Sequence, residues 1–249
     1  MQRKTLAKPD GRQLHLYSRT EITSDPAPSP GTDALHPNPH LRWHPLRAEW
    51  VTYAAQRQGR PFLPPSDYNP LAPTTNPEFP TELPQGDFEI AVFDNRFPSL
   101  ALEAHDPPDS IVPTAAGIGH CEVVVFSQNA SDSLTTMELG KLELLIKVWT
   151  ERYLEIGALE QIKYVMPFEN RGVEMGVTLH HPHGQIYAYD HVPPIPAREL
   201  EQQQRFFDAH GRGLLEDIIG TELEADERIV ARAASVIAFI PAFARYPFE

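Results

Sequence analysis

The sequence predicts an α+β fold, in which short strands are separated by long loops and accompanied by few helices. Runs rich in β-branched, aliphatic and aromatic residues predict strands. These runs lie at 88–93, 122–126, 162–166, 184–189 and 235–240. Because the strands do not alternate regularly with helices, we do not expect repeated βαβ winding.

Two stretches have the periodicity of amphipathic helices. The first helix is expected to begin near Thr135, because Thr135 and Glu138 have the spacing of a capping box. Its apolar residues recur at helical spacing and predict one core-facing side, made of Leu142, Leu145, Ile146, Trp149 and Tyr153. A second helix is expected over 197–207, and residues 214–219 would continue it.

Proline is frequent, at 26 residues, and is concentrated at 26–45, 61–84 and 193–196. Since proline does not fit inside a regular helix, these stretches predict extended loops that wrap the core. A PxxP signalling ligand is disfavoured, because the prolines alternate with aromatic residues and arginines. Residues 1–40 are expected to form an N-terminal extension or loop, and residues 41–249 the main domain.

The composition restricts the possible partners. A formal net charge of −13 argues against binding to nucleic acid or an anionic membrane, which are recognised by clustered lysine and arginine. No apolar run reaches the roughly 20 residues that a membrane-spanning helix needs. The single cysteine, Cys121, cannot form an internal disulfide, which fits a reducing cytoplasm. A mononucleotide ligand remains compatible, because its site needs only a few local donors.

The most informative segment is a histidine-rich run that leads into an apolar strand. His181, His183 and Gln185 stand at i, i+2 and i+4, so an extended chain would place all three side chains on one face. Polar groups that converge on a buried strand need partners, because unsatisfied ones are costly. The non-catalytic alternative is a cluster of structural histidines or an adventitious metal site.

The residues around this run favour phosphate chemistry instead. Residues with no side chain or a small one let backbone N–H groups approach an anion closely. Such residues here are Gly172, Gly176, Thr178 and Gly184. A neutral imidazole is a suitable nucleophile at phosphorus, and an acceptor such as a backbone carbonyl would fix its tautomer. His183 is the candidate nucleophile, and Gln185 is the candidate donor to the developing charge.

The segment HPHGQ at 181–185 resembles the active-site signature of the galactose-1-phosphate uridylyltransferase family, within the histidine-triad superfamily. Histidine-triad hydrolases carry a third histidine at the position of Gln185, so the resemblance is to the transferase branch. It implies a histidine-triad-like antiparallel sheet, or half-barrel, with flanking helices. It also implies ping-pong exchange of UMP between UDP-glucose and galactose 1-phosphate through a uridylyl-His183, with no cofactor required for the chemistry.

The same resemblance implies which residues surround UDP-glucose or UDP-galactose and the hexose 1-phosphates. It assigns two arginines to the diphosphate, a polar turn to the phosphates and an aromatic wall to the uridine. These expected substrate-binding residues are Arg57, Arg60, Leu71, Phe93, Asn95, Arg96, Asn170, Gly176, Val177 and Thr178. Without the resemblance, Arg57 and Arg60 would be interpreted as solvated loop charges.

The family's usual zinc pattern is broken in this chain. Many members bind a structural zinc through a Cys-x-x-Cys pair, a later histidine and the first histidine of the signature. The matching positions here are Asn69, Ala72, Ala130 and His181. A structural zinc needs four ligands, so we expect this site to be absent. Glu199 matches a carboxylate of a second metal site in some relatives, but alone it is typical of a first helical turn.

The resemblance also implies that a further part of the fold follows in relatives. Residues 240–249 resemble a mid-protein segment, after which about a third of the fold supplies contacts to the hexose. We therefore expect a homodimer or a separate C-terminal fragment to complete the site. Two alternatives stay open. One is a related nucleotidyl transferase or phosphorylase that acts on ADP-sugars or dinucleoside polyphosphates; the other is a catalytically weak nucleotide-binding fragment.

Overall fold

The computed structural model describes the chain except for residues 60–67, 173–174, 176, 178 and 248–249. It consists of two compact units, 1–192 and 193–249. This division differs from the expected one, with an extension over 1–40 and a single domain over 41–249. The reason lies in long-range strand pairing, which brings the N-terminal residues into the first unit.

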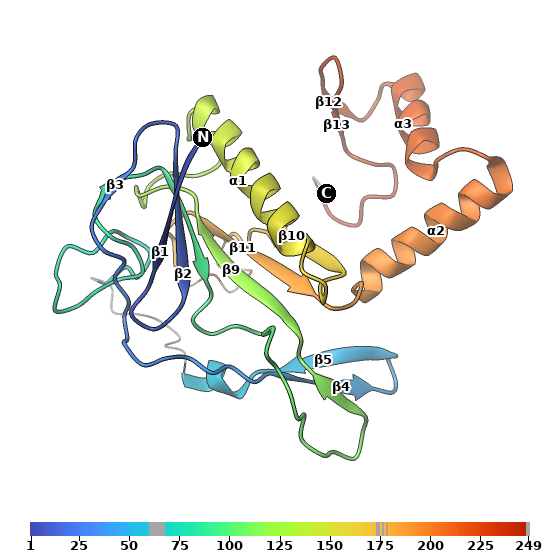
Figure 1. Cartoon of the computed structure of the whole chain (residues 1–249). Helices are drawn as coiled ribbons and strands as arrows, with labels where there is room; N and C mark the ends of the chain where they lie inside the picture. Colours follow the sequence, from blue (N-terminus) through green and yellow to red (C-terminus); the bar gives the residue numbers. More distant parts are fainter. Residues whose placement is uncertain (60–67, 173–174, 176, 178, 248–249) are drawn as a thin grey trace. The chain divides into compact units, whose positions relative to one another are not determined.

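The first unit is built on one antiparallel sheet (Figure 1). In the part of the chain that the structure describes, six strands form it in the order β1-β2-β7-β9-β11-β10. Their bounds are β1 (Gln2–Ala7), β2 (Gln13–Ser18), β7 (Ile90–Asp94), β9 (Gly119–Val125), β10 (Tyr164–Phe168) and β11 (His183–Tyr189). The strands predicted at 88–93, 122–126, 162–166 and 184–189 correspond to β7, β9, β10 and β11. The α+β class and the antiparallel sheet are therefore confirmed.

The hairpin β1–β2 was not predicted from the sequence. Leu14 and Leu16 alternate with His15 in β2, and all three side chains are buried. Apolar alternation of this kind is a strand signal, but here charged residues surround it and both faces of the strand are covered. Residues 1–40 thus supply two strands to the central sheet.

Smaller sheets and a 3₁₀ turn also belong to the first unit. They are a three-stranded sheet of β4 (His40–His44), β5 (Glu49–Tyr53) and β8 (Thr114–Ala116), a pair of β3 (Thr23–Ser24) and β6 (Gly86–Asp87), and a 3₁₀ turn, η1 (Ala55–Gly59).

Helix α1 (Leu139–Gly157) covers one face of the central sheet (Figure 1). Residues of the helix and of the sheet share one core cluster, which includes Leu144, Leu145, Val148, Ile156, Val92, Val124 and Ile186. The predicted core side was partly wrong, since Ile146 and Tyr153 are 59% and 49% exposed. The buried stripe consists of residues 144, 145, 148, 152 and 156. Arg152 is among them because it pairs with the buried Glu122 of β9.

The predicted capping box does not form at the start of α1. Glu138 is itself the N-cap and makes no side-chain cap hydrogen bond. Its carboxylate pairs instead with Arg19, which also binds Glu89. A long-range ion pair has therefore replaced the local cap that the spacing predicted.

The opposite face of the sheet is covered by loops. Residues of the sheet and of the proline-rich segments form a second core cluster, which includes Leu14, Leu16, Ala91, Phe93 and Val125 with Ala27, Leu71, Leu83 and Phe88. These loops pack over strands β2 and β7, whereas β11 lies nearer the other edge of the sheet. This separation leaves room for a polar site.

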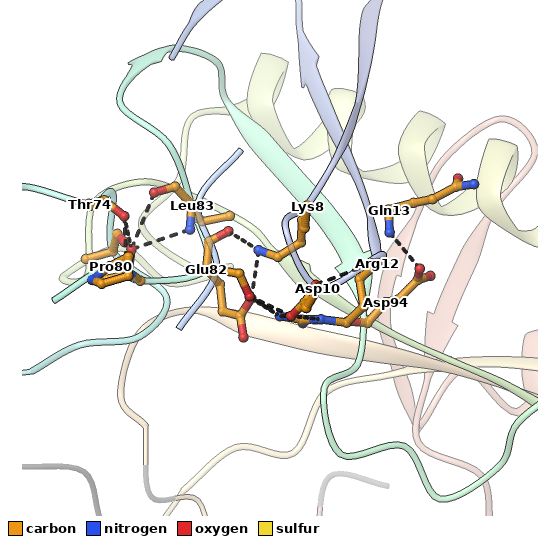
Figure 2. Close-up of polar contacts among 12 residues, drawn as sticks. Lys8, Asp10, Arg12, Gln13, Thr74, Pro80, Glu82, Leu83 and Asp94 are labelled. Atoms are coloured by element: carbon orange, nitrogen blue, oxygen red, sulfur yellow. Dashed lines mark hydrogen bonds and ion pairs between the residues drawn. The ribbon is translucent and has the colours of Figure 1, made fainter. Parts of the chain in front are cut away.

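A buried ionic cluster fastens the loop around residue 82 to the β1–β2 turn (Figure 2). Lys8 Nζ and Arg12 Nη2 lie 2.7 and 2.8 Å from the same carboxylate oxygen of Glu82. Asp10 accepts hydrogen bonds from Arg12 and Ser29. Burial opposes ionisation of Asp10, but these bonds outweigh it and lower its pKa. Burial also lowers the pKa of Lys8, although Glu82 opposes that shift.

Protonation of His15 is expected to destabilise the protein in mild acid. The ring is buried, and its Nδ1 accepts a hydrogen bond from Arg3 at 3.2 Å. Burial, together with Arg152 and Arg3, lowers its pKa from 6.5 to about 4. Because the folded pKa is below the unfolded one, this stability is present above pH 6.5 and is lost as the pH falls through about 4.

Urea unfolding of wild type and a His15→Gln variant between pH 7 and 4 checks this prediction. The wild type should lose up to about 3 kcal/mol more than the variant over that range. Parallel pH dependences of the two proteins would contradict it. His120→Gln is the matched control. Burial opposes protonation of His120, but Glu122 and Asp94 outweigh it and raise its pKa, so the stability that it contributes changes with the opposite sign.

The second unit contains α2 (Pro194–His210), α3 (Leu214–Ala225) and a hairpin of β12 (Ile229–Arg232) and β13 (Ile237–Phe239). Residues 214–219 do not continue the preceding helix, because Gly211 ends α2 with a left-handed φ of 67°. The strand predicted at 235–240 is β13, which pairs with β12 rather than with the central sheet. No described helix is long and apolar enough to cross a membrane.

Candidate active site

The HPHGQ segment places its polar side chains at the start of β11, on the sheet face away from α1. Gly184, Ile186 and Ala188 of β11 are buried, and the last two belong to the core cluster shared with α1. By strand alternation, His183 and Gln185 point to the other face. Of the three side chains predicted to share a face, His183 and Gln185 do so, whereas His181 lies before the strand begins.

Gly184 has a packing role in addition to lining the cavity beside His183. A Cβ on this residue would lie 2.7 Å from the Phe168 carbonyl oxygen and 2.8 Å from the Phe126 ring. Both atoms are part of tightly packed neighbours. Any larger residue would push β11 away from β10 and so displace His183.

One tautomer of His183 is selected by a backbone carbonyl. Nδ1 of the ring lies 2.7 Å from the carbonyl oxygen of His181. A carbonyl can only accept, so Nδ1 carries the proton and the lone pair of the neutral ring is on Nε2. The expected fixing of the tautomer by a carbonyl is thus present in the structure.

His181 precedes the strand and is held on both ring nitrogens. Its Nε2 donates to the Ser127 carbonyl at 2.6 Å, and its Nδ1 accepts from the Asn69 amide at 2.9 Å. The ring is 3% exposed. Burial lowers its pKa, and the neighbouring His183 lowers it further, although the Ser127 carbonyl opposes this. His181 is therefore a neutral ring fixed in one orientation.

A cavity of about 300 Å³ opens beside His183. Polar and aromatic side chains from η1, β10, β11 and the loop between these strands line it. The lining residues are Arg57, Phe168, Asn170, Met175, Val177, Leu179, His183, Gly184, Gln185 and Tyr187. Of the expected site residues, Arg57, Asn170 and Val177 are thus gathered around His183 and Gln185.

The expected uridine wall is only partly at this cavity. Asn95 Nδ2 lies 3.5 Å from Gln185 Oε1, so the two amides are neighbours. The Arg96 guanidinium lies 5.7 Å from the Phe97 ring. Leu71 and Phe93, in contrast, are buried in the second core cluster. Leu71 belongs to the loop that packs over β2 and β7, and Phe93 belongs to β7. Arg60, Gly176 and Thr178 lie outside the described residues.

The residues at the family's zinc position do not fit a zinc ion. Ala72 and Ala130 have no ligand atom, and both nitrogens of His181 are already hydrogen-bonded. Glu199 is exposed on α2, in the second unit. These side chains therefore do not form a four-ligand site.

A different group of ligand-type side chains lies on the α1 face of the sheet. The ligand atoms of Asp94, His120 and Glu122 lie within 4.8 Å of one another. However, both carboxylate oxygens of Glu122 bind Arg152, at 3.0 and 2.6 Å. The Arg152 guanidinium already neutralises the Glu122 carboxylate. These side chains are therefore better described as an ion-pair network than as a metal site. The His-x-Glu alternation in β9 was the sequence signal for this cluster.

Known proteins match most of the chain. The family model for the N-terminal domain of galactose-1-phosphate uridyl transferase matches residues 32–193. The galactose-1-phosphate uridylyltransferase of Streptomyces lividans is 34% identical over 241 residues, which are 96% of this chain and 63% of that protein. The Thermotoga maritima enzyme is 32% identical over 84% of this chain and 64% of its own length.

A solved uridylyltransferase structure has the same fold. It superposes with a TM-score of 0.70 at 25% sequence identity, over 84% of this chain and 63% of that chain. The chain therefore spans slightly less than two thirds of the length of these relatives.

Proposed function

This chain belongs to the galactose-1-phosphate uridylyltransferase family, and from that premise we propose that it transfers a uridylyl group from UDP-glucose to galactose 1-phosphate through a covalent intermediate on His183. The observation that carries the proposal is the 2.7 Å hydrogen bond from His183 Nδ1 to the His181 carbonyl, at the wall of the cavity. It provides an unprotonated Nε2, which is the nucleophile that the reaction needs.

In the first half-reaction, the Nε2 lone pair attacks the α-phosphorus of UDP-glucose. The bond from this phosphorus to the bridging oxygen breaks, and its electron pair leaves with glucose 1-phosphate. The ring keeps its Nδ1 proton and becomes a uridylylated imidazolium. Its hydrogen bond to the His181 carbonyl then becomes charge-assisted, so this contact stabilises the transition state more than the ground state.

In the second half-reaction, a phosphate oxygen of galactose 1-phosphate attacks the same phosphorus. The P–N bond breaks, its electrons return to Nε2, and UDP-galactose leaves. A homodimer of this chain belongs to this proposal. Sedimentation of the purified protein, with and without galactose 1-phosphate, would measure the assembly.

The lining residues supply donors for the phosphate oxygens. The Arg57 guanidinium reaches the cavity while its Nη1 donates to the Phe97 carbonyl at 2.7 Å, so its position is fixed. Asn170 and Gln185 add neutral amide groups. Donors that are already oriented before the reaction stabilise developing charge without further reorganisation.

The proposal is tested by incubation with UDP-glucose labelled at the α-phosphorus. We expect stoichiometric labelling of the protein, release of glucose 1-phosphate, and an adduct that is labile in acid and stable in base. Galactose 1-phosphate should then release the label as UDP-galactose. Labelled ADP-glucose serves as the comparison, and preferential labelling by it would favour an ADP-sugar transferase. No labelling by either nucleotide would overturn the proposal.

Replacing Gln185 with alanine is expected to slow labelling without abolishing it. The variant loses one oriented amide donor, and such losses cost about 10²- to 10³-fold in rate. Single-turnover labelling at saturating UDP-glucose measures the effect. Gln202→Ala, on the exposed surface of α2, is the control. A Gln185→Ala rate equal to that of the control would remove Gln185 from the mechanism.

A further inference from the structure

The HPHGQ segment is attached to the rest of the fold by hydrogen bonds on two sides. On one side, Phe126 N–H donates to the Pro182 carbonyl at 3.0 Å and His181 Nε2 donates to the Ser127 carbonyl at 2.6 Å. On the other side, the Asn69 amide donates to His181 Nδ1 at 2.9 Å. The His181 ring is thus the connection between β9, the loop at residue 69 and the start of β11.

The orientation of the Asn69 amide is itself determined. Asn69 Oδ1 accepts a hydrogen bond from the Leu71 backbone N–H at 3.0 Å, so the oxygen is directed into the loop. The NH₂ group therefore points to His181 and must donate. Leu71 is buried in the second core cluster, which anchors this loop on the sheet. A rigid donor is in this way presented to the His181 ring.

We propose that Asn69 is a positioning residue for His183, and that it acts by holding His181 between its own amide and the Ser127 carbonyl. With the ring fixed, the His181 carbonyl stays at 2.7 Å from His183 Nδ1 and keeps the proton on that nitrogen. Loss of the Asn69 donor leaves His181 Nδ1 buried without this partner, so the ring turns and its carbonyl moves. The role of His183 as nucleophile rests on the proposed function.

This role also accounts for the departure from the zinc pattern of the family. The hydrogen-bonded His181 links the same three parts of the chain that a metal at this position would link. A neutral amide donor and a carbonyl acceptor satisfy a neutral imidazole completely. Zinc coordination would require one of these two hydrogen bonds to be broken.

Asn69→Asp is the decisive variant, because it removes the hydrogen bond to His181 and keeps the one that forms the turn. An aspartate keeps the acceptor for the Leu71 N–H, so the loop is retained, but it cannot donate to a neutral His181. Asn69→Ala removes both interactions. The matched control is Asn76→Asp, since Asn76 is exposed in the same loop and accepts from Glu78 N–H at 3.0 Å in the same way.

The first measurement is the tautomeric state of the histidines by long-range ¹H–¹⁵N correlation, which needs no substrate. Wild type and Asn76→Asp should show His183 with its proton on Nδ1 and His181 with its proton on Nε2. Asn69→Ala should give mixed tautomers at both residues. Wild-type tautomers in both Asn69 variants would overturn the positioning role, whatever the protein does with UDP-glucose.

The second measurement is single-turnover labelling by UDP-glucose. Asn69→Ala should slow labelling by about 10- to 100-fold, the range for outer hydrogen-bond partners of functional histidines, with unchanged KM. Asn69→Asp should also slow labelling at neutral pH, because a carboxylate cannot donate a hydrogen bond to the neutral His181 ring.

The two measurements distinguish the failure of this inference from that of the proposed function. Labelled wild type with an Asn69→Asp rate equal to that of Asn76→Asp at neutral pH would overturn the role of Asn69 alone. Unlabelled wild type with the expected tautomers would overturn only the function. Stoichiometric zinc that survives dialysis against a chelator in wild type but is absent from a His181→Asn variant would show that His181 is a ligand, and would overturn the hydrogen-bonded arrangement. We expect a chelator to leave the Tm unchanged.

Discussion

Replacing His183 with asparagine is expected to abolish uridylylation by UDP-glucose. An asparagine amide is polar and close to imidazole in reach, but its nitrogen lone pair is delocalised and cannot attack phosphorus. Removal of a catalytic nucleophile costs on the order of 10⁶-fold in rate. Labelling of the variant should therefore fall below detection, while urea unfolding should stay close to that of wild type, because His183 is only half-buried.

The control for this prediction is His180→Asn. His180 is the exposed neighbour of the HPHGQ segment and lines the adjoining cavity, of about 340 Å³, without belonging to β11. Its variant should be labelled at the wild-type rate. Undiminished labelling of His183→Asn would place the nucleophile elsewhere, and peptide mapping of the adduct would identify it.

Replacing Glu82 with glutamine is expected to give the largest loss of stability. The Glu82 carboxylate faces both Lys8 and Arg12 in a buried cluster (Figure 2). Without its charge, two buried cations are left with Asp10 as the remaining carboxylate of the cluster. Removal of one partner from a buried ion pair costs about 3–5 kcal/mol. Urea unfolding at neutral pH should show a loss of that size, and a change below 1 kcal/mol would contradict the prediction.

Glu78→Gln is the matched control, because Glu78 is an exposed carboxylate of the same loop. Its effect should be within about 0.5 kcal/mol. A Lys8→Met change in the Glu82→Gln background should restore part of the stability, since it removes an unpaired buried cation. Additive effects of the two changes would show that Lys8 and Glu82 do not interact.

Much of the central fold could be read from local sequence patterns. Strands β7, β9, β10 and β11 and helix α1 were predicted within a few residues at most boundaries. Strand periodicity alone placed His183 and Gln185 on one face. The HPHGQ segment itself identified the family, which the comparisons confirm.

Other features depend on residues that are far apart in the chain. Asn69 and His181 are 112 residues apart, and Lys8 and Glu82 are 74 apart. No local periodicity encodes such pairs. The hairpin β1–β2 was missed for the same reason, because its burial depends on β7 and on loops that pack across it.

The sequence by itself therefore determined the fold class and the candidate nucleophile, because each is a property of residue type and short spacing. The break in the zinc pattern followed from the residue types at the positions that match the family. Only the tertiary structure decided what those residues do. In the folded chain, Leu71 and Phe93 are buried in the core, Arg152 forms an ion pair with Glu122, and the Asn69 amide donates a hydrogen bond to His181. The physical reason is that burial and hydrogen-bond partners are set by which distant segments pack together, and packing is decided by the whole chain.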